Sequence, residues 1–266
     1  MSDDRRLSIL HTCWEGHPSG QTRVILDLAR GQAAAGHRVR VACPADSPLE
    51  QMVRAAGIVA APLAFGRPAE TGSVIAGTAT EQAADLVNAH SSRDRKAALW
   101  ARRRGRMTAA LVFTRHVRTL TFPLRLWWQS RGVDRIIAVS GDVARRLVER
   151  GAPGAKIVVV PNGLPPGFLN GPPDEEAVAV ARARIARIAG APVIGVVSRR
   201  KAQEVLVSAA RHVKRPLNIA LIGISPEAAI EKLAAAVPRH AVTFVPFVED
   251  PRAYYACLTI SALPSR

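Results

Sequence analysis

Short apolar runs alternate with amphipathic stretches through the first 160 residues. The apolar runs occupy residues 7–12, 38–42, 58–63, 85–90, 110–114, 135–139 and 156–160. Most of the intervening stretches have apolar residues at helical spacing, most clearly 21–35, which Gly36 follows as a C-cap. The apolar runs are rich in Val, Ile and Leu and do not alternate with polar residues. This pattern predicts βαβ units and a parallel sheet covered by helices on both faces.

A break in this rhythm separates two parts of the chain. Pro161, Asn162 and Gly163 form a predicted turn, and four prolines follow within residues 164–173. The rhythm then resumes with predicted strands at 192–197, 217–223, 242–247 and 258–263, and helices at 202–213, 226–237 and 251–257. Doubly wound domains usually have about six strands. We therefore expect a first domain at 1–163, a linker with a linking helix at 164–190, and an incomplete second domain at 191–266.

Composition favours a folded protein that works in a reducing compartment. Of the 266 residues 48% are hydrophobic, and the mean hydropathy is +0.08, which excludes disorder as the main state. Three scattered cysteines exclude a disulfide scaffold and have no metal-ligand spacing. No apolar run has the length of a membrane span, and the N-terminus does not resemble a signal peptide. We expect a cytoplasmic protein.

Positive charge is concentrated in one segment. The net charge is +16, and residues 93–131 contain eleven basic residues and one acid. Such a patch favours an anionic partner. Five aromatic residues lie among these cations: Trp100, Phe113, Phe122, Trp127 and Trp128. Since no nucleic-acid-binding motif is present, we expect an anionic membrane surface as the partner of 93–131, and no nucleic acid. Alternatively, some of these aromatics belong to the core and the arginines are simply solvated.

Polar residues follow several of the predicted strands. In open α/β sheets, ligands bind beyond the carboxyl ends of the strands. His11, His90 and His116 follow the first, fourth and fifth strands, and Gly20 precedes a helix whose N-terminus favours anions. In the second domain, residues 199–201 place three cations directly after a strand, which suits a diphosphate. Alternatively, the histidines cap backbone groups, and the cations are a solvated cluster.

Taken together, the motifs resemble those of family 4 retaining glycosyltransferases. The glycine loop and first helix of that family are similar to residues 19–29, and its donor-phosphate turn is similar to Arg199, Lys201 and residues 203–206. The other matching segments, in chain order, are residues 36–39, 88–92, 113–116, 137–140, 156–163, 247–251 and 263–265. The resemblance therefore covers almost the whole chain, and the shared order of the segments makes it specific.

The resemblance implies a fold and a reaction. It implies the GT-B fold, in which two Rossmann-like, doubly wound domains face a cleft. The implied enzyme moves a sugar from a nucleotide-sugar donor to a glycan or lipid-linked acceptor, of the kind found in cell-envelope polysaccharide or lipopolysaccharide. It implies retention of configuration and no need for a metal or cofactor. A lipid-linked acceptor would favour a peripheral position on the inner face of the cytoplasmic membrane.

The resemblance also implies roles for individual residues. Gly20 would let the loop approach the donor diphosphate or the transferred sugar, and His116 would lie beside the anomeric carbon as the catalytic candidate. Arg199 and Lys201 would neutralise the leaving diphosphate, and Val248 would contact the nucleotide base through its backbone. On the acceptor side, the implied candidates are His90 and Ser91.

The sequence departs from the family pattern at two places. Only Arg200 separates Arg199 from Lys201, and Ala202 stands where the family usually has glycine. The family's paired glutamates, which hold the donor sugar and ribose, would follow residue 265, and the sequence stops at Arg266. We therefore expect a chain shortened at its C-terminus that binds a nucleotide sugar weakly. Two alternatives follow: an inactive remnant, and a nucleotide-sugar epimerase of the same fold.

Overall fold

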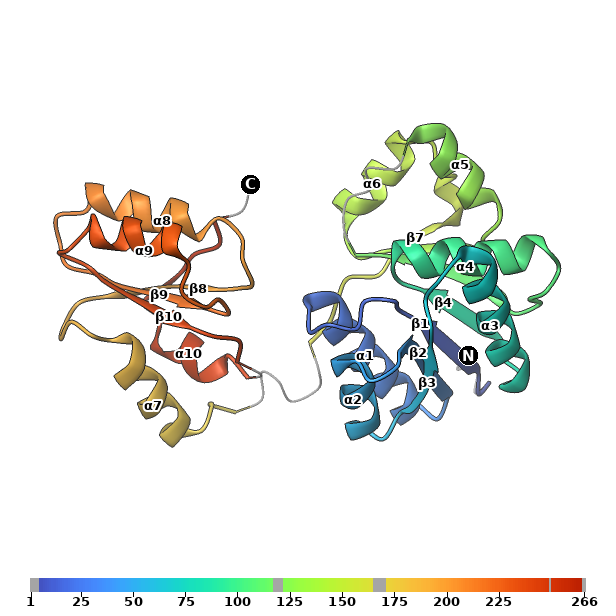
Figure 1. Cartoon of the computed structure of the whole chain (residues 1–266), viewed down its shortest axis with the longest axis horizontal. Helices are drawn as coiled ribbons and strands as arrows, with labels where there is room; N and C mark the ends of the chain where they lie inside the picture. Colours follow the sequence, from blue (N-terminus) through green and yellow to red (C-terminus); the bar gives the residue numbers. More distant parts are fainter. Residues whose placement is uncertain (1–4, 117–121, 165–170, 249, 265–266) are drawn as a thin grey trace. The chain divides into compact units, whose positions relative to one another are not determined.

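The chain folds as two compact units, Met1–Pro166 and Gly167–Arg266. A computed structural model describes residues 5–116, 122–164, 171–248 and 250–264. Each unit consists of a parallel β-sheet between layers of α-helices (Figure 1). The predicted α/β architecture of two parallel-sheet domains is confirmed.

The first unit contains a seven-stranded parallel sheet in the order β3-β2-β1-β4-β5-β6-β7. Its strands lie where the apolar runs predict them. They are β1 (Ser8–Thr12), β2 (Arg38–Pro44), β3 (Val59–Leu63), β4 (Leu86–Ala89), β5 (Ala110–Arg115), β6 (Arg135–Ala138) and β7 (Ile157–Val159). Burial along the central strands, such as all five residues of β1, explains why they do not alternate with polar residues, whereas the edge strands β3 and β7 are partly exposed.

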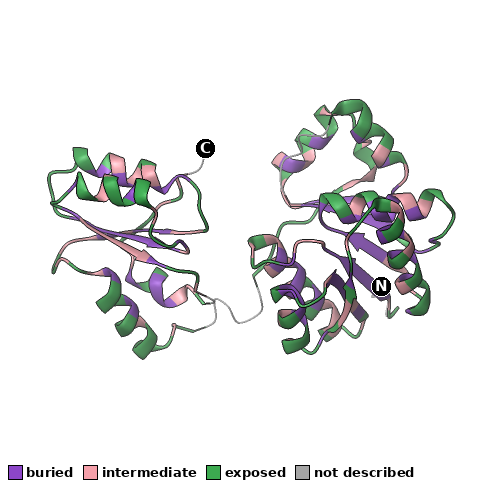
Figure 2. Ribbon diagram, viewed as in Figure 1, coloured by how far each residue is buried: buried purple, intermediate pink, exposed green. Residues whose placement is uncertain are grey.

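Helices cover both faces of this sheet. On one face, α1 (Gly20–Ala34) and α2 (Pro48–Ala55) bury Ile25 and Leu49 against Val41 of β2. On the other face, Ile75 and Leu126 share a core with Leu111 of β5. The helices of that face are α3 (Pro68–Glu81), α4 (Ser92–Arg103), α5 (Pro123–Arg131) and α6 (Gly141–Glu149), and a 3-10 turn at Gly154–Lys156 precedes β7. Buried residues therefore concentrate in the central layer (Figure 2).

The second unit repeats this arrangement with four strands. The sheet order is β10-β9-β8-β11, for β8 (Val193–Val197), β9 (Asn218–Ile222), β10 (Ala241–Val245) and β11 (Ile260–Ser261). One face is covered by α8 (Gln203–Ala209), which continues as a 3-10 turn at Ala210–His212, and by α9 (Ala228–Ala235). The other face is covered by α7 (Glu175–Ile185) and α10 (Arg252–Cys257).

Helix α7 lies within the range that the sequence assigns to the linker. Asp174 caps it by accepting a hydrogen bond from the Ala177 N–H. Its buried residues Ala181 and Ile185 join the core that contains Val193 and Tyr254. The helix is therefore part of the second unit, because its apolar face is buried against that unit's sheet.

Each sheet has a point at which the direction of winding reverses. In the first unit, β1 lies between β2 and β4, and in the second, β8 lies between β9 and β11. At such a point, the loops that follow the two central strands diverge to opposite faces and leave room for a ligand. We therefore expect ligand-binding residues in the loops that follow β1 and β8.

The contact between α3 and α4 provides a test of packing in the first unit. A Cβ added at Gly72 would lie 2.5 Å from the carbonyl oxygen of Ala97, whereas one at Gly77 of the same helix would meet nothing within 4 Å. We expect Gly72→Ala to lower the free energy of unfolding by about 1–3 kcal/mol through overpacking. Gly77→Ala should raise it by about 1 kcal/mol, because alanine favours the helix.

Urea unfolding followed by tryptophan fluorescence measures this effect, because all four tryptophans lie in the first unit. An unchanged midpoint for Gly72→Ala would show that the two helices move apart freely and would contradict the close packing.

Candidate functional site

Three histidines form a hydrogen-bonded row at the winding reversal of the first sheet. His11 belongs to β1, and His90 and His116 directly follow β4 and β5. The His11 Nδ1 lies 3.0 Å from the His90 Nε2, and the His90 Nδ1 lies 3.0 Å from the His116 Nε2. At its inner end, the His11 Nε2 lies 2.7 Å from the Oε1 of Gln32 on α1. The structure thus brings together the three strand-end histidines that the sequence singles out.

Burial keeps these histidines neutral. His11 and His90 are buried, and removal from water lowers the pKa of both; for His90 the pKa is well below its ordinary value. Burial and then the charge of Arg95 lower the pKa of His116 to about 4. At neutral pH each ring therefore carries one proton, so each offers one donor and one acceptor nitrogen.

A buried carboxylate fixes the backbone beside this row. Asp94, in the first turn of α4, accepts hydrogen bonds from the N–H groups of His90 and Ser91 and from the Thr12 hydroxyl. Burial raises the pKa of Asp94 to about 6, although these hydrogen bonds oppose the shift. Asp94 therefore ties the ends of β1 and β4 to α4. In the sequence, Asp94 stands out only as the one acidic residue of the basic segment 93–131.

Two arginines add positive charge near the histidines. Arg95 donates hydrogen bonds to the carbonyl oxygens of His90 and Thr114. Arg115, at the end of β5, is 6% exposed, and its Nε has no hydrogen-bond partner among the described residues. Burial and then the neighbouring Arg95 charge lower the pKa of Arg115 to about 9. This edge of the sheet therefore favours negatively charged or hydroxyl-bearing ligands.

The two acceptor-side candidates, His90 and Ser91, are both buried. His90 is 1% exposed, and both of its ring nitrogens face other histidines. Ser91 is 7% exposed and begins α4 as its N-cap. In the described structure, both candidates are therefore buried, and His90 lies between His11 and His116.

The loop after β1 leads into the N-terminus of α1. Ser19 caps the helix by accepting a hydrogen bond from the Thr22 N–H, and the Thr22 hydroxyl accepts one from the Ser19 N–H. A Cβ at Gly16 would lie 2.6 Å from the Ser47 Cβ, so Gly16 is required for packing. A Cβ at Gly20 would meet nothing within 4 Å. The space beside Gly20 is therefore open to a ligand.

In the second unit, the turn after β8 is held by one buried side chain. The Gln203 Oε1 accepts a hydrogen bond from the Lys201 N–H, and the Gln203 Nε2 donates one to the Arg199 carbonyl oxygen. Gly223 has φ +99°, and a Cβ there would lie 2.8 Å from the Ser198 carbonyl oxygen. The hydrogen bonds of Gln203 and the close approach of Gly223 therefore fix the backbone of the turn that carries the three cations.

The three consecutive cations of this turn have different partners. Arg200 forms salt bridges with Glu204 and Glu227. Arg199 and Lys201 are exposed and, within the described parts of the chain, have no ion-pair partner for their side chains. The expected phosphate-binding pair is therefore free, whereas the cation between them is part of the local structure. Val248, the other donor-side candidate, follows β10 and is partly buried against the core.

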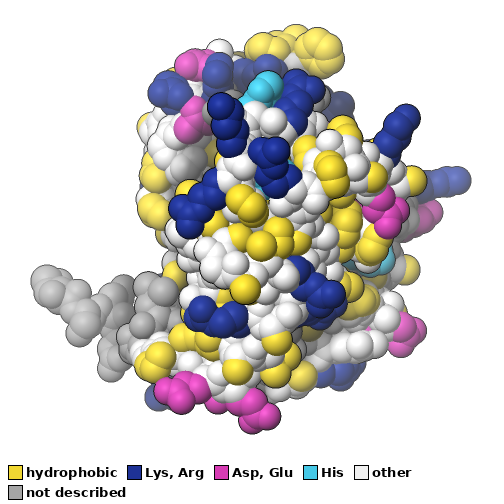
Figure 3. Space-filling view, turned by 90° about the vertical axis from the view of Figure 1, so that its left-hand side faces the viewer, with side chains coloured by type: hydrophobic (Ala, Val, Ile, Leu, Met, Phe, Trp, Pro, Cys, Tyr) yellow, Lys and Arg dark blue, Asp and Glu magenta, His cyan; other side chains and the backbone are white. Residues whose placement is uncertain are grey.

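In the view of Figure 3, basic side chains are widespread and acidic side chains lie mainly at the margins.

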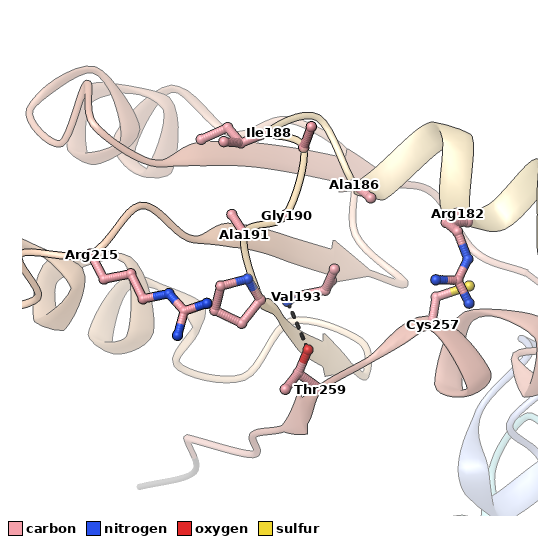
Figure 4. A pocket seen from close by; sticks show the side chains of 11 residues that line it. Arg182, Ala186, Ile188, Gly190, Ala191, Val193, Arg215, Cys257 and Thr259 are labelled. Atoms are coloured by element: carbon pink, nitrogen blue, oxygen red, sulfur yellow. Dashed lines mark hydrogen bonds between the residues drawn. The ribbon is translucent and has the colours of Figure 1, made fainter.

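The second unit contains a cavity of about 520 Å³ that is lined by Arg182, Arg215, Cys257 and Thr259, among others (Figure 4). Because Val193 begins β8 and Thr259 immediately precedes β11, this cavity lies at the amino ends of the strands. It is therefore at the opposite edge of the sheet from Arg199 and Lys201.

The aromatic residues of the basic segment divide between core and surface. Phe113 is 2% exposed and lies in the core, and Trp100 packs partly against it. Four apolar residues on and beside α5 are exposed: Phe122, Leu124, Trp127 and Trp128. The Arg103 guanidinium stacks over the Trp128 ring, and that of Arg131 stacks over Trp127. The exposed aromatic residues of the segment therefore lie on and beside α5.

Two features are absent from the described residues, a membrane-spanning helix and a cluster of metal ligands. None of the helices in them has the length and apolar character needed to cross a membrane. Within the same residues, His, Cys, Asp and Glu side chains form no group of three or more arranged to hold a metal ion.

Solved glycosyltransferase structures share this fold. A glycosyltransferase from Rickettsia africae superposes with a TM-score of 0.81 at 19% identity, covering 97% of this chain and 72% of that one. Anabaena Alr3699/HepE in complex with UDP-glucose gives 0.81 at 18% identity, covering 98% and 74%. The lipopolysaccharide outer core galactosyltransferase WaaB gives 0.60 at 16% identity, covering 91% and 68%. No curated protein matches the chain by sequence.

Family models match both units. The model of Glycosyltransferase Family 4 matches residues 18–168, and the model of Glycosyl transferases group 1 matches residues 191–266. The first match alone covers more than half of the chain and includes Gly20, the histidines that follow β4 and β5, and the basic segment. With the paired parallel sheets and the position of these residues at the strand ends, it follows that the chain belongs to the family 4 glycosyltransferases and is an enzyme of the glycosyltransferase kind.

Proposed function

We propose that this glycosyltransferase moves a sugar from a nucleotide-sugar donor to a glycan or lipid-linked acceptor with retention of configuration and without a metal. The observation that carries the proposal is the turn after β8, where Arg199 and Lys201 lack partners among the described residues. The relative with bound UDP-glucose supports a donor of this class. The acceptor class, of the cell-envelope polysaccharide or lipopolysaccharide type, is supported by the similarity to a lipopolysaccharide galactosyltransferase.

In this proposal Arg199 and Lys201 bind the diphosphate of the donor. When the bond to the sugar breaks, negative charge develops on the leaving diphosphate, and preorganised cations stabilise it. Two side-chain cations on a turn fixed by Gln203 supply the positive charge that a metal ion supplies in other transferases. Val248 contacts the base of the nucleotide through its backbone. This arrangement is the basis for proposing a reaction that needs neither a metal nor a cofactor.

In the first unit, His116 is the proposed catalytic residue and contacts the sugar at the reacting carbon. Its neutral imidazole suits a hydrogen bond to a hydroxyl group. The open space beside Gly20, at the N-terminus of α1, suits an anionic or hydroxyl-rich group of the substrate. Ser91 and His90 remain acceptor-side candidates, with His90 acting through His116.

The first unit is also proposed to dock on an anionic membrane at the inner face of the cytoplasmic membrane. On α5, Leu126 and Ser130 are buried, which leaves Leu124, Trp127 and Trp128 on the outer face. Phe122, the N-cap of α5, is exposed as well, and the guanidinium groups of Arg103 and Arg131 lie over the two tryptophan rings. Exposed aromatic residues with cations around them suit the boundary between lipid headgroups and acyl chains.

The donor site is tested by titrating UDP-glucose into the 266-residue protein and following backbone amides 198–202 by NMR. We expect saturable shifts of these amides. Arg199→Ala and Lys201→Ala should each weaken binding about tenfold, the loss of one charge-assisted hydrogen bond. Arg215→Ala removes the same charge from the opposite edge of the sheet and should have little effect. Equal losses for Arg215→Ala and Arg199→Ala would contradict a specific phosphate site.

Retention and metal independence are tested on donor hydrolysis. UDP-glucose carries an α-linked sugar, so a retaining enzyme that transfers glucose to water releases α-glucose first. We expect this anomer in early proton NMR spectra, at the same rate with and without EDTA. Early release of β-glucose would contradict retention, and loss of activity in EDTA that Mg²⁺ restores would contradict metal independence.

Membrane docking is tested by flotation with phosphatidylglycerol vesicles at low salt. We expect the protein to float with these vesicles and not with phosphatidylcholine vesicles. The double variant Phe122→Ser/Leu124→Ser should float at least several-fold less, because it removes apolar area that inserts into the interface. Val180→Ser, at an exposed apolar position of α7, is the matched control. Equal flotation of the double variant and the control would contradict docking through α5.

A further inference from the structure

The histidine row has a fixed direction, which Gln32 sets at its inner end. The Gln32 Oε1 lies 2.7 Å from the His11 Nε2, and an amide oxygen only accepts hydrogen bonds. The proton on His11 is therefore on Nε2. Because burial keeps His11 neutral, its Nδ1 carries a lone pair and accepts a hydrogen bond.

The tautomer of His11 determines the tautomer of His90, which in turn determines that of His116. The His90 Nε2–H donates to the His11 Nδ1, so the His90 Nδ1 is the acceptor nitrogen of a neutral ring. The His116 Nε2–H then donates to the His90 Nδ1. The result at the outer end is a neutral His116 whose Nδ1 bears a lone pair.

Two observations at His116 support this direction. Its Nδ1 is buried and has no hydrogen-bond partner among the described residues. In the reverse direction this nitrogen would carry a buried, unpaired N–H, which is rarer in proteins than an acceptor without a partner. The positive charge of Arg95 also acts on the His116 ring, and a cation favours a lone pair over an N–H.

We propose that Gln32, His11 and His90 are positioning residues that hold His116 with an unprotonated Nδ1. This nitrogen is buried in the structure described here, and in the complex with the sugar substrate it accepts a hydrogen bond from a hydroxyl group. The assignment of the protons depends on the row alone. The contact with a hydroxyl rests on the proposed function. A neutral imidazole in the other tautomer would present an N–H at this position, which suits an ether or carbonyl oxygen.

NMR of protein labelled with ¹⁵N-histidine, at neutral pH and without ligand, shows which ring nitrogens of the row carry a proton. We expect the His116 Nδ1 to have the downfield shift of an unprotonated ring nitrogen. His37 is an internal reference, because the Leu7 N–H donates to its Nδ1 and fixes the same tautomer outside the row. A protonated Nδ1 on His116 would overturn the proposal.

Variants of Gln32 test its part in setting the direction. Gln32→Leu removes the acceptor, so both nitrogens of His116 should move to intermediate shifts as two tautomers interconvert. Gln32→Glu supplies a carboxylate that accepts the same proton and should restore the original spectrum. Gln51→Leu, at an exposed position of α2, is the matched control. An unchanged His116 spectrum in Gln32→Leu with an intact fold would overturn the role of Gln32.

Addition of UDP-glucose separates this inference from the proposed function. We expect the His116 Nδ1 resonance to move upfield as it accepts a hydrogen bond, while the amides of 198–202 shift at the same concentrations. In Gln32→Leu, binding should weaken roughly fivefold, the loss of one neutral hydrogen bond. Movement of the amides without movement of Nδ1 would overturn the hydroxyl contact. If neither moves, the proposed donor fails and the ligand-free spectrum still decides the tautomer.

Discussion

The parallel pairing of strands is the constraint on which the rest of this structure depends. Parallel strands need crossover connections, so helices cover both faces of each sheet and the strands are buried. Polar side chains within the sheet have access to ligands only at the strand ends. The histidine row at the ends of β1, β4 and β5 and the cations after β8 both lie at such ends, where the winding of each sheet reverses.

The side chains at these two places differ in charge, because those of the histidine row are neutral and those after β8 are positively charged. In the first unit, burial keeps the three histidines neutral, and Asp94 is held by backbone N–H groups. In the second unit, Arg199 and Lys201 are exposed beside an Arg200 that already has two acidic partners. Neutral hydrogen-bonding groups suit a sugar, and exposed cations without ion-pair partners in the described part of the chain suit a diphosphate. The proposed division of roles between the two units follows from this contrast.

Much of the fold was predictable, because buried parallel strands occur in the sequence as short continuous apolar runs. All seven strands of the first sheet and all four of the second lie in or overlap the apolar runs. The positions of His90 and His116 after their strands followed from the same pattern, whereas His11 lies within β1 and does not follow it as predicted. The pattern did not show that Gln32 and Asp94 belong to the same region, because Gln32 is 21 residues from His11 and Asp94 is 82 residues from Thr12.

The sequence by itself determined the succession of strands and helices, the positions that follow each strand, and the family, because these depend on local periodicity and on the order of motifs. Only the tertiary structure decided that Arg200 is the one of three adjacent cations with ion-pair partners among the described residues, which aromatic residues are exposed, and that His90 lies between two other histidines. The reason is that burial and pairing depend on side chains that are distant in sequence. Residues next to each other in the chain, such as Arg199 and Arg200, have different neighbours in space and therefore different properties.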